Sequence, residues 1–356
     1  MEKTIMSVLK QLAEKNQKSL STLQIQIESD LLPQPFIHSS SKPDASFHSA
    51  SVGKMMTAVV IVQAIEKGWL DWNATVESIL GPLLLEGLFD YRGISYSSSV
   101  TVEQLLGHQS GVNDYFEGKS TLKPSLIDRV IQEKDVFYKP TDLLDITRNH
   151  QSPLAPPNKT FHYSDTGYVL LGLIAEKVYK VPFHVVLREN IFDRLGMDHT
   201  GLLFYDPKVS IETIEPVIVR NVDVRLHQSL SIDFSGGGLS TTTQDLTRFL
   251  KAIRDFTLIS EDSYKKMAHC SNHFEAGMYY GLGLMELRFE KFFFLLKGLP
   301  RLYGHLGVLG VHAWFNPSTG DTFVINVGNM NQMVSSFQLL IQLVMTIEKK
   351  RKIRKA

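Results

Sequence analysis

Hydrophobic positions along the first seventy residues change their spacing from segment to segment. Apolar side chains recur every three or four residues over 5–12, which predicts an amphipathic helix. Over 22–28 they alternate with polar residues, as in a half-buried strand. Residues 32–45 are rich in Pro and Ser and are expected to form a loop. Residues 51–68 form a nearly continuous apolar run, which predicts a buried helix.

The pattern after residue 70 separates a mainly helical middle from a C-terminal part that mixes strands and helices. The helices expected in the middle are at 102–106, 168–178 and 182–195. After three successive glycines at 236–238, Thr242 is placed to cap a further helix, with Asp245 in its first turn. The last expected elements are two strands and a helix, at 310–316, 322–328 and 333–345.

Two segments combine hydrophobic with basic residues. Residues 291–301 could form a lid or contact surface, although a core strand with its loop is the favoured interpretation. The basic tail at 349–355 could touch an anionic membrane or nucleic acid. The favoured interpretation is a solvated helix end, where cations complement the helix dipole. No apolar run is long enough to span a bilayer, and residues 1–17 lack a signal-peptide core, so we expect a cytoplasmic protein without an integral membrane segment.

Composition excludes several classes of function. The 356 residues are 43% hydrophobic and 21% charged, which is typical of a globular protein with one large domain or two lobes. Because 37 basic residues balance 37 acidic ones, no overall field would attract nucleic acid, and a small-molecule or peptide substrate is expected. The 12 histidines show no metal-ligand spacing, and Cys270 lies in no reactive motif. We expect no metal and no cofactor, and the oligomeric state is not indicated.

A Ser-x-x-Lys pair provides candidate nucleophile chemistry. At the start of a helix the two side chains share one face, so the amine could accept the hydroxyl proton or stabilise the alkoxide. The chain contains five such pairs, which begin at Ser7, Ser39, Ser51, Ser120 and Ser263. Only Ser51 opens a long apolar helix, whose N-terminus would also direct N–H groups toward an oxyanion. Ser51 and Lys54 are therefore the predicted nucleophile and its partner.

Several segments, in the same order, resemble motifs of the beta-lactamase-related serine hydrolases, which include class C beta-lactamases and DD-peptidases (penicillin-binding proteins). The segment around Ser51 resembles the first motif, and Tyr163-Ser-Asp165 resembles the second, Tyr-x-Asn. His305-Leu-Gly307 resembles the third, which reads Lys-Thr-Gly in some branches and His-x-Gly in others. Further markers occur at 66–71, 101–111, 195–200 and 236–241, so that the resemblance spans about residues 45–330.

Two other matches compete with these motifs. His199-Thr-Gly201 reads like the third motif, but it follows a helix-like segment and precedes the glycine-rich marker, whereas His305 precedes a strand pattern. Ser164-Asp-Thr166 resembles the Ser-Asp-Asn motif of another branch, but its surroundings resemble the Tyr-x-Asn branch. We therefore favour His305 and Tyr163.

The resemblance implies an α+β fold of the beta-lactamase/transpeptidase type, with an antiparallel sheet flanked by helices plus a helical lobe. Residues 1–50 and 231–356 would form the mixed lobe, and 51–230 the helical lobe, with the nucleophile helix at their interface. Ser51 would attack an ester, amide or lactam carbonyl and form an acyl-enzyme that water later releases.

Roles for the remaining motif residues also follow from the resemblance. Lys54 and Tyr163 would share the proton transfers, and neither is singled out as the base. Backbone N–H groups of Ser51 and Val308 would form the oxyanion hole. His305 would line the cleft, and would orient Tyr163 or contact the substrate.

The sequence departs from the family pattern at two site positions. Asp165 stands where Asn is usual, and a carboxylate near Lys54 would favour the ammonium form and shift the base role toward Tyr163. Leu306, beside Gly307 in the expected substrate site, replaces a Thr that usually helps to hold a substrate carboxylate. These departures are the arguments for the alternative function, a non-catalytic penicillin-binding or ligand-binding protein on the same fold.

Overall fold

Strands from both ends of the chain form one sheet in the computed structural model, which describes residues 4–42 and 44–355. The eight strands follow the order β10-β11-β12-β13-β14-β15-β1-β2, and all neighbours are antiparallel. Their bounds are β1 Gln24–Glu28, β2 Phe36–Ser39, β10 Asn272–Glu275, β11 Met278–Tyr280, β12 Met285–Leu287, β13 Leu302–Gly307, β14 Val311–Phe315 and β15 Thr322–Asn326. The N-terminal strands thus extend a sheet built mainly from the C-terminal part of the chain.

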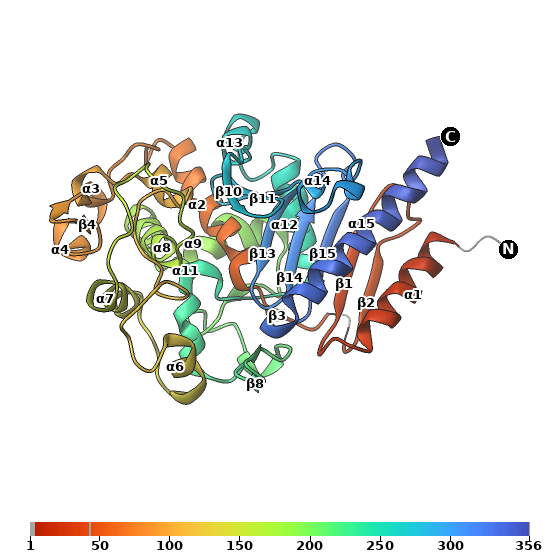
Figure 1. The fold of residues 1–356 in the computed structure, drawn as a ribbon, viewed down its shortest axis with the longest axis horizontal. Helices are drawn as coiled ribbons and strands as arrows, with labels where there is room; N and C mark the ends of the chain where they lie inside the picture. Colours follow the sequence, from red (N-terminus) through yellow and green to blue (C-terminus); the bar gives the residue numbers. More distant parts are fainter. Residues whose placement is uncertain (1–3, 43, 356) are drawn as a thin grey trace.

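Helices fall into two groups, one beside the sheet and one in the middle of the chain (Figure 1). Those beside the sheet are α1 Ile5–Gln17, α12 Thr243–Arg254, α13 Glu261–Met267, α14 Phe289–Phe292 and α15 Met333–Lys355. The others are α2 Lys54–Glu66, α3 Val76–Leu80, α4 Pro82–Leu85, α5 Val102–Leu106, α6 Leu126–Gln132, α7 Pro140–His150, α8 Asp165–Tyr179, α9 Phe183–Leu187, α10 Asp193–Leu195 and α11 Phe234–Gly237. Short strands form three smaller sheets: β3 Phe47–His48, β9 Leu239–Thr241 and β6 Gly201–Leu202; β4 Asp90–Tyr91 and β5 Ile94–Ser95; β7 Ile218–Val219 and β8 Val222–Asp223.

Both faces of the large sheet are buried, because successive side chains of a strand point to opposite faces. On β15, Phe323 and Ile325 belong to the core that α1 and α15 cover, whereas Val324 belongs to the core that includes α12. Figure 1 shows α15 crossing the strands with α1 beside it. The expected α+β fold, an antiparallel sheet flanked by helices with further helices to one side, is confirmed. The division at residues 50/51 and 230/231 stays a prediction.

Helix α2 carries the candidate nucleophile into the centre of the molecule. All of its residues from Lys54 to Ala64 are buried, as expected for a helix that is apolar on every side. It packs against α8, and the N-terminal ends of the two helices meet. This packing brings Ser51, just before α2, close to Asp165, the first residue of α8.

Most helices and strands expected from the pattern are present, including those at 5–12, 22–28, 102–106 and 333–345. Thr242 caps α12 as expected, since its hydroxyl accepts the N–H of Asp245 at 3.1 Å. Within the described residues, no helix has both the length and the apolarity needed to cross a membrane.

Two expectations about secondary structure were wrong, and the helix expected at 182–195 is present with a change of winding. The expected loop at 32–45 contains β2, which depends on pairing with β1 and shows only a short local pattern. The expected helix at 182–195 is divided, because 188–192 winds as a π-helix between α9 and α10. Residues 291–301 form no core strand: they contain the end of α14 and the turn η6 (Phe294–Leu296), and β13 begins only at residue 302.

Candidate active site

A short helical turn, η1 (Ala50–Gly53), presents Ser51 at the start of α2. Ala50 has φ 47°, a left-handed conformation that is uncommon for a residue with a side chain. Its N–H is held by His48 Nδ1 at 3.0 Å, and His48 Nε2 lies 3.2 Å from a carboxylate oxygen of Asp233. These contacts hold a strained backbone next to the nucleophile, as is common in active sites.

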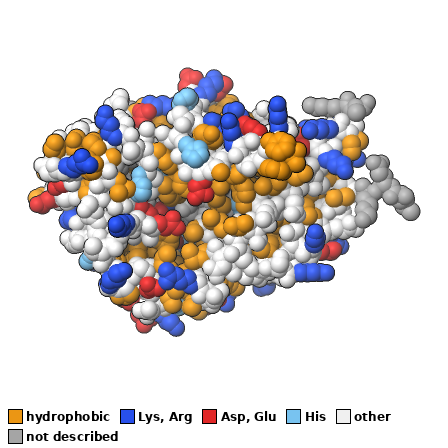
Figure 2. Space-filling view, viewed as in Figure 1, with side chains coloured by type: hydrophobic (Ala, Val, Ile, Leu, Met, Phe, Trp, Pro, Cys, Tyr) orange, Lys and Arg blue, Asp and Glu red, His pale blue; other side chains and the backbone are white. Residues whose placement is uncertain are grey.

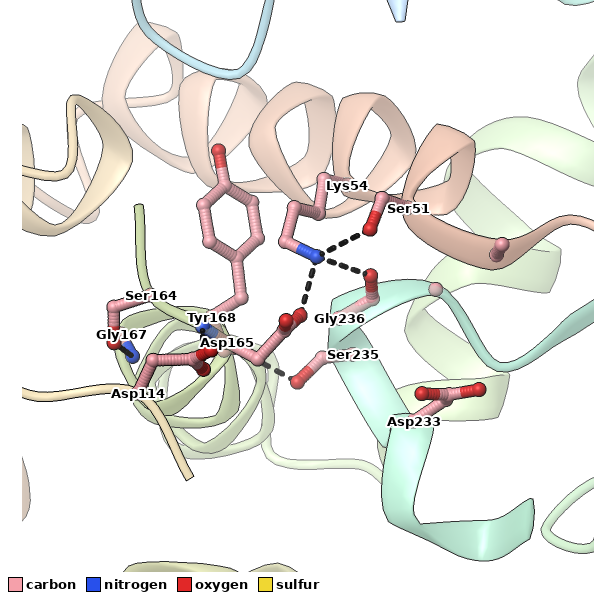
Figure 3. Close-up of polar contacts among 12 residues, drawn as sticks. Ser51, Lys54, Asp114, Ser164, Asp165, Gly167, Tyr168, Asp233, Ser235 and Gly236 are labelled. Atoms are coloured by element: carbon pink, nitrogen blue, oxygen red, sulfur yellow. Dashed lines mark hydrogen bonds and ion pairs between the residues drawn. The ribbon is translucent and has the colours of Figure 1, made fainter. Parts of the chain in front are cut away.

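Lys54 is completely buried, and its ammonium group contacts three oxygen atoms (Figure 3). Nζ donates to Ser51 Oγ at 3.0 Å and to the Gly236 carbonyl at 2.8 Å, and it forms an ion pair with the Asp165 carboxylate. An ammonium group has three protons, so this set uses all of them. A Cβ on Gly236 would lie 2.6 Å from an Asp165 oxygen, so only glycine fits here.

Two carboxyl groups share the buried space beyond Lys54. Burial raises the pKa of Asp165, although Lys54 opposes that effect. Asp114 accepts the Asp165 N–H at 2.9 Å, and burial together with the Asp165 charge raises the pKa of Asp114 to about 7. The site therefore holds one ammonium group, one carboxylate paired with it, and a second carboxyl that titrates near neutral pH.

Tyr163 lies beside this pair, with Lys54 Nζ 4.9 Å from the centre of its ring. The ring also stacks on His108, with 4.3 Å between ring centres. Burial raises the pKa of Tyr163 well above its usual range, and the Asp165 charge raises it further, whereas the Ser51 hydroxyl lowers it. At neutral pH the phenol is therefore protonated, so that it resembles a proton donor more than a base.

His305 is buried behind the cleft wall rather than on its surface, where the sequence analysis had placed it. Its Nδ1 contacts the Leu306 carbonyl at 2.8 Å and its Nε2 contacts the Tyr280 hydroxyl at 3.1 Å. Burial and the Lys54 charge lower the pKa of His305 to about 3, so the imidazole is neutral. It lies 6.3 Å from Tyr163 between ring centres and could act only through its neighbours.

The end of β13 passes directly beside the nucleophile turn. A Cβ on Gly307 would lie 2.8 Å from Ala50 Cβ and 3.0 Å from the Ser49 carbonyl, so a glycine is required for this approach. The next residue, Val308, lines the cleft together with Ser51. The predicted oxyanion-hole residues are thus neighbours, and the role of their N–H groups stays a prediction.

Two adjoining pockets meet at Ser51, Phe116, Asp165 and Val308 and form the cleft. The first is mainly apolar, with walls that include Ile127, Leu230, Ile232, Leu309 and Met330. The second is lined by residues that include Glu117, Phe274, Glu275, Met285 and Leu306. Figure 2 shows acidic side chains gathered in the hollowed centre of the molecule.

The charged side chains that line this cleft are all acidic. The lining includes four carboxyl groups, Asp165, Asp233, Glu117 and Glu275, and none of the described residues that line it is a Lys or Arg. Burial and the Asp165 charge both raise the pKa of Glu117, as expected where carboxylates are crowded. The opening of the cleft is therefore unfavourable for anions.

Several residues of the site carried no signal in the sequence. His48, Asp114, Asp233 and Glu275 lie outside the motifs and reach the site only through the fold. The competing His199 lies elsewhere, beside Asp245 of α12. Among the described residues, no group of three or more His, Cys, Asp or Glu side chains is arranged to hold a metal ion.

Similarity to known proteins identifies the family of the chain. A family model described as Beta-lactamase matches residues 38–343, most of the chain. The chain belongs to the beta-lactamase family. It is 27% identical over 239 residues to the putative penicillin-binding protein PbpX of Bacillus subtilis (strain 168), covering 64% of this chain and 51% of that protein. It is 25% identical over 240 residues to protein flp of Staphylococcus aureus (strain COL), covering 65% and 42%. The chain thus spans about half the length, or less, of these relatives.

Solved structures show that the beta-lactamase-family fold extends over nearly the whole chain. The D-amino acid amidase from Ochrobactrum anthropi SV3, complexed with L-phenylalanine, superposes with a TM-score of 0.81 at 18% identity, covering 98% of this chain and 100% of the amidase. The penicillin binding protein from Bacillus halodurans gives a TM-score of 0.71 at 23% identity, covering 96% and 100%. At these identities the likeness establishes the fold alone.

Proposed function

We propose that the protein is a serine hydrolase in which Ser51 forms an acyl-enzyme from an ester or amide. The observation that carries the proposal is the contact of Lys54 Nζ with Ser51 Oγ at 3.0 Å, at a point where two pockets meet. A buried amine beside a serine hydroxyl at the start of a helix is an arrangement that activates a nucleophile. Val308 N–H and Ser51 N–H would stabilise the oxyanion.

The protonation states of the groups around Ser51 determine when its hydroxyl can react. With Lys54 as ammonium, Asp165 as carboxylate and Tyr163 as phenol, neither proposed base can take up the serine proton, because the ammonium has no lone pair and a neutral phenol is too weak a base. One proton must first leave this set, so that Lys54 or Tyr163 is unprotonated. Ser51 then bonds to the carbonyl carbon while its proton moves to that group, and the same proton passes to the leaving alcohol or amine. Water repeats these steps to release the acid.

The lining of the cleft selects the substrate class. The apolar pocket would hold an uncharged acyl or side-chain group, whereas Glu117 and Glu275 at the other side favour a neutral or amine-bearing substrate. Leu306 offers no hydroxyl to a substrate carboxylate. Substrates with a carboxylate near the scissile bond, as in beta-lactam antibiotics, should therefore react poorly. The D-amino acid amidase from Ochrobactrum anthropi SV3, which shares the fold, has been solved in complex with L-phenylalanine amide. That compound is an amine-bearing amide, which supports this class.

Covalent labelling tests the nucleophile. The intact mass of the protein after reaction with a fluorophosphonate should increase by one adduct, and the Ser51→Ala variant should show none. The proposal fails if the wild-type protein stays unlabelled or if Ser51→Ala is labelled equally.

A matched substrate pair tests the class. Phenylalanine p-nitroanilide has a free amine, and its N-succinyl derivative has a carboxylate in the same place. We expect a higher kcat/KM for the free amine. Equal rates, or faster cleavage of the succinyl derivative or of the beta-lactam nitrocefin, would contradict the assignment.

A second candidate is a binding protein without turnover on the same fold. The ion pair of Lys54 with Asp165 favours it, because that pair places a carboxylate against the amine that would have to accept the serine proton. An unlabelled wild-type protein that still binds penicillin or an amino-acid amide in calorimetry would establish this candidate.

A further inference from the structure

Two segments that combine apolar and basic residues lie side by side on the surface. One is 291–299, around α14 and η6, and the other is 345–354, at the end of α15. Residues of both line one groove, and a Cβ on Gly298 would lie 3.7 Å from Lys352 Nζ. From the sequence, the first segment was expected to be a core strand with its loop, and the second a solvated helix end. The fold brings the two together into one apolar–basic surface.

The exposed part of this surface lies between two residues that pack against the core, Phe292 and Leu296. Phe292 packs on Phe337 of α15, with 4.9 Å between ring centres. The next two residues point outward, so that Phe293 is 52% exposed and Phe294 72%, and Leu295 follows at 67%. Figure 2 shows hydrophobic side chains gathered in the region that Figure 1 labels α14, with basic side chains nearby. Three large apolar neighbours left outside the core mark a contact surface.

Positive charge surrounds the aromatic side chains. Segments 291–299 and 345–354 together contain seven Lys and Arg residues but one acidic residue, Glu348, which is paired with Arg351. Arg351 and Arg354 also pair with Asp30, and Arg351 pairs with Asp321, so that the unpaired positive charge of this surface comes from its lysines. Among the described residues, no carboxylate forms an ion pair with the lysines of this surface, Lys291, Lys297, Lys349, Lys350 and Lys352.

We propose that the apolar–basic surface binds peripherally to an anionic membrane. Phe293 and Phe294 would enter the boundary between headgroups and acyl chains, while the lysines lie over lipid phosphates. Charge complementarity together with the aliphatic side chains selects this occupant, since a bilayer presents an anionic and an apolar layer to one face. A nucleic acid would match the cations but not Leu295 and Ile353. The proposal does not depend on the hydrolase chemistry.

Vesicle sedimentation of the full chain tests the aromatic contribution. Binding to vesicles that contain phosphatidylserine should exceed binding to phosphatidylcholine vesicles and should weaken as salt is added. Phe293→Ser combined with Phe294→Ser should lower the partition coefficient at least about tenfold. The control is Leu83→Ser combined with Ile94→Ser, which removes two exposed apolar side chains elsewhere and should leave binding unchanged.

The charge contribution has its own pair of variants. Each Lys near an anionic membrane contributes about fivefold to partitioning, so that the triple change Lys349→Gln, Lys350→Gln and Lys352→Gln should lower binding about a hundredfold. Three exposed lysines of the helical part provide the control, Lys119→Gln, Lys123→Gln and Lys134→Gln. This control removes the same charge from the chain and should change binding little.

Three results would overturn the proposal. In the first, the wild-type protein binds both kinds of vesicle equally or not at all. In the second, the protein self-associates without lipid and the aromatic variant abolishes this, which would make the surface an interface between copies. In the third, the aromatic variant changes hydrolysis of a soluble ester but not vesicle binding, which would make the segment a lid.

Discussion

Replacing Asp165 by Asn removes the carboxylate that contacts Lys54 while keeping a side chain of the same shape. Two opposite charges about 4 Å apart attract by about 4 kcal/mol at an effective dielectric constant near 20. A neighbouring charge typically displaces a pKa by about one to three units, and each unit corresponds to about 1.36 kcal/mol. The carboxylate also raises the pKa of Tyr163, so that the substitution favours loss of the phenol proton.

We therefore expect Asp165→Asn to move the ascending limb of the kcat/KM profile down by about one to three pH units. The rate at pH near 7 should then rise at least about tenfold, because a tenfold change corresponds to one unit on that limb. The wild-type profile should still be rising in the alkaline range.

The assay is hydrolysis of p-nitrophenyl butyrate, a neutral ester, across pH at constant ionic strength. Titration with a fluorophosphonate gives the concentration of active sites for each variant. Glu117→Gln makes the same carboxyl-to-amide change at the cleft opening, where the Glu117 charge is the smallest of the causes that raise the pKa of Tyr163, and should move the limb much less. If Asp165→Asn is inactive at every pH although it is folded, Asp165 itself accepts the proton through Lys54 and the reasoning is refuted.

Three further predictions concern the surroundings of the nucleophile. Because burial and Asp165 raise the pKa of Asp114 to about 7, the folded state binds its proton more tightly than the unfolded chain does, and stability should fall as pH rises from about 4 to 7. Asp114→Asn should reduce this fall by roughly 2–4 kcal/mol in denaturant titrations at several pH values; an identical pH dependence would contradict the assignment. Glu117→Gln with Glu275→Gln should raise KM for phenylalanine p-nitroanilide about tenfold but leave KM for a neutral ester unchanged, and equal effects would speak against the acidic subsite. Gly307→Ala, whose Cβ would meet that of Ala50 at 2.8 Å, should lower kcat/KM about a hundredfold with the circular dichroism spectrum retained; wild-type activity would show that the close approach is dispensable.

The parts of the fold that the sequence predicted are those whose pattern is local and long. Helix α2 is apolar on all sides over three turns, and a turn-forming stretch separates the alternating or apolar runs of β14 and β15. Strand β2 was missed because it is short and lies at the edge of the sheet, so that its identity depends on the ladder that it forms with β1. The aromatic run at 292–294 was misjudged for a different reason: hydrophobicity alone does not tell whether a side chain enters the core, and here only Phe292 does.

For the site, the motifs identified the chemical groups but not their protonation states. Ser51 and Lys54 could be placed together because they are three residues apart at a helix start, and their contact at 3.0 Å agrees. The sequence indicated only the direction in which the Asp165 carboxylate acts on the neighbouring proton-transfer groups. The size of that effect also depends on Asp114, a second buried carboxyl group, which comes from a loop about fifty residues away in the sequence. Likewise, the third motif does not indicate that the imidazole of His305 is neutral and contacts the Tyr280 hydroxyl.

Substrate selection is likewise a property that the motifs alone do not reveal. A motif specifies which atoms react, whereas charge at the opening is summed over side chains from several loops and strands. Glu117 lies in the loop after α5 and Glu275 is the last residue of β10, and neither belongs to a motif. Under the proposed function, Leu306 in the third motif and the carboxylates outside the motifs act in the same direction, against anionic substrates. Two independent features that act in the same direction support this proposed substrate class more strongly than either feature alone.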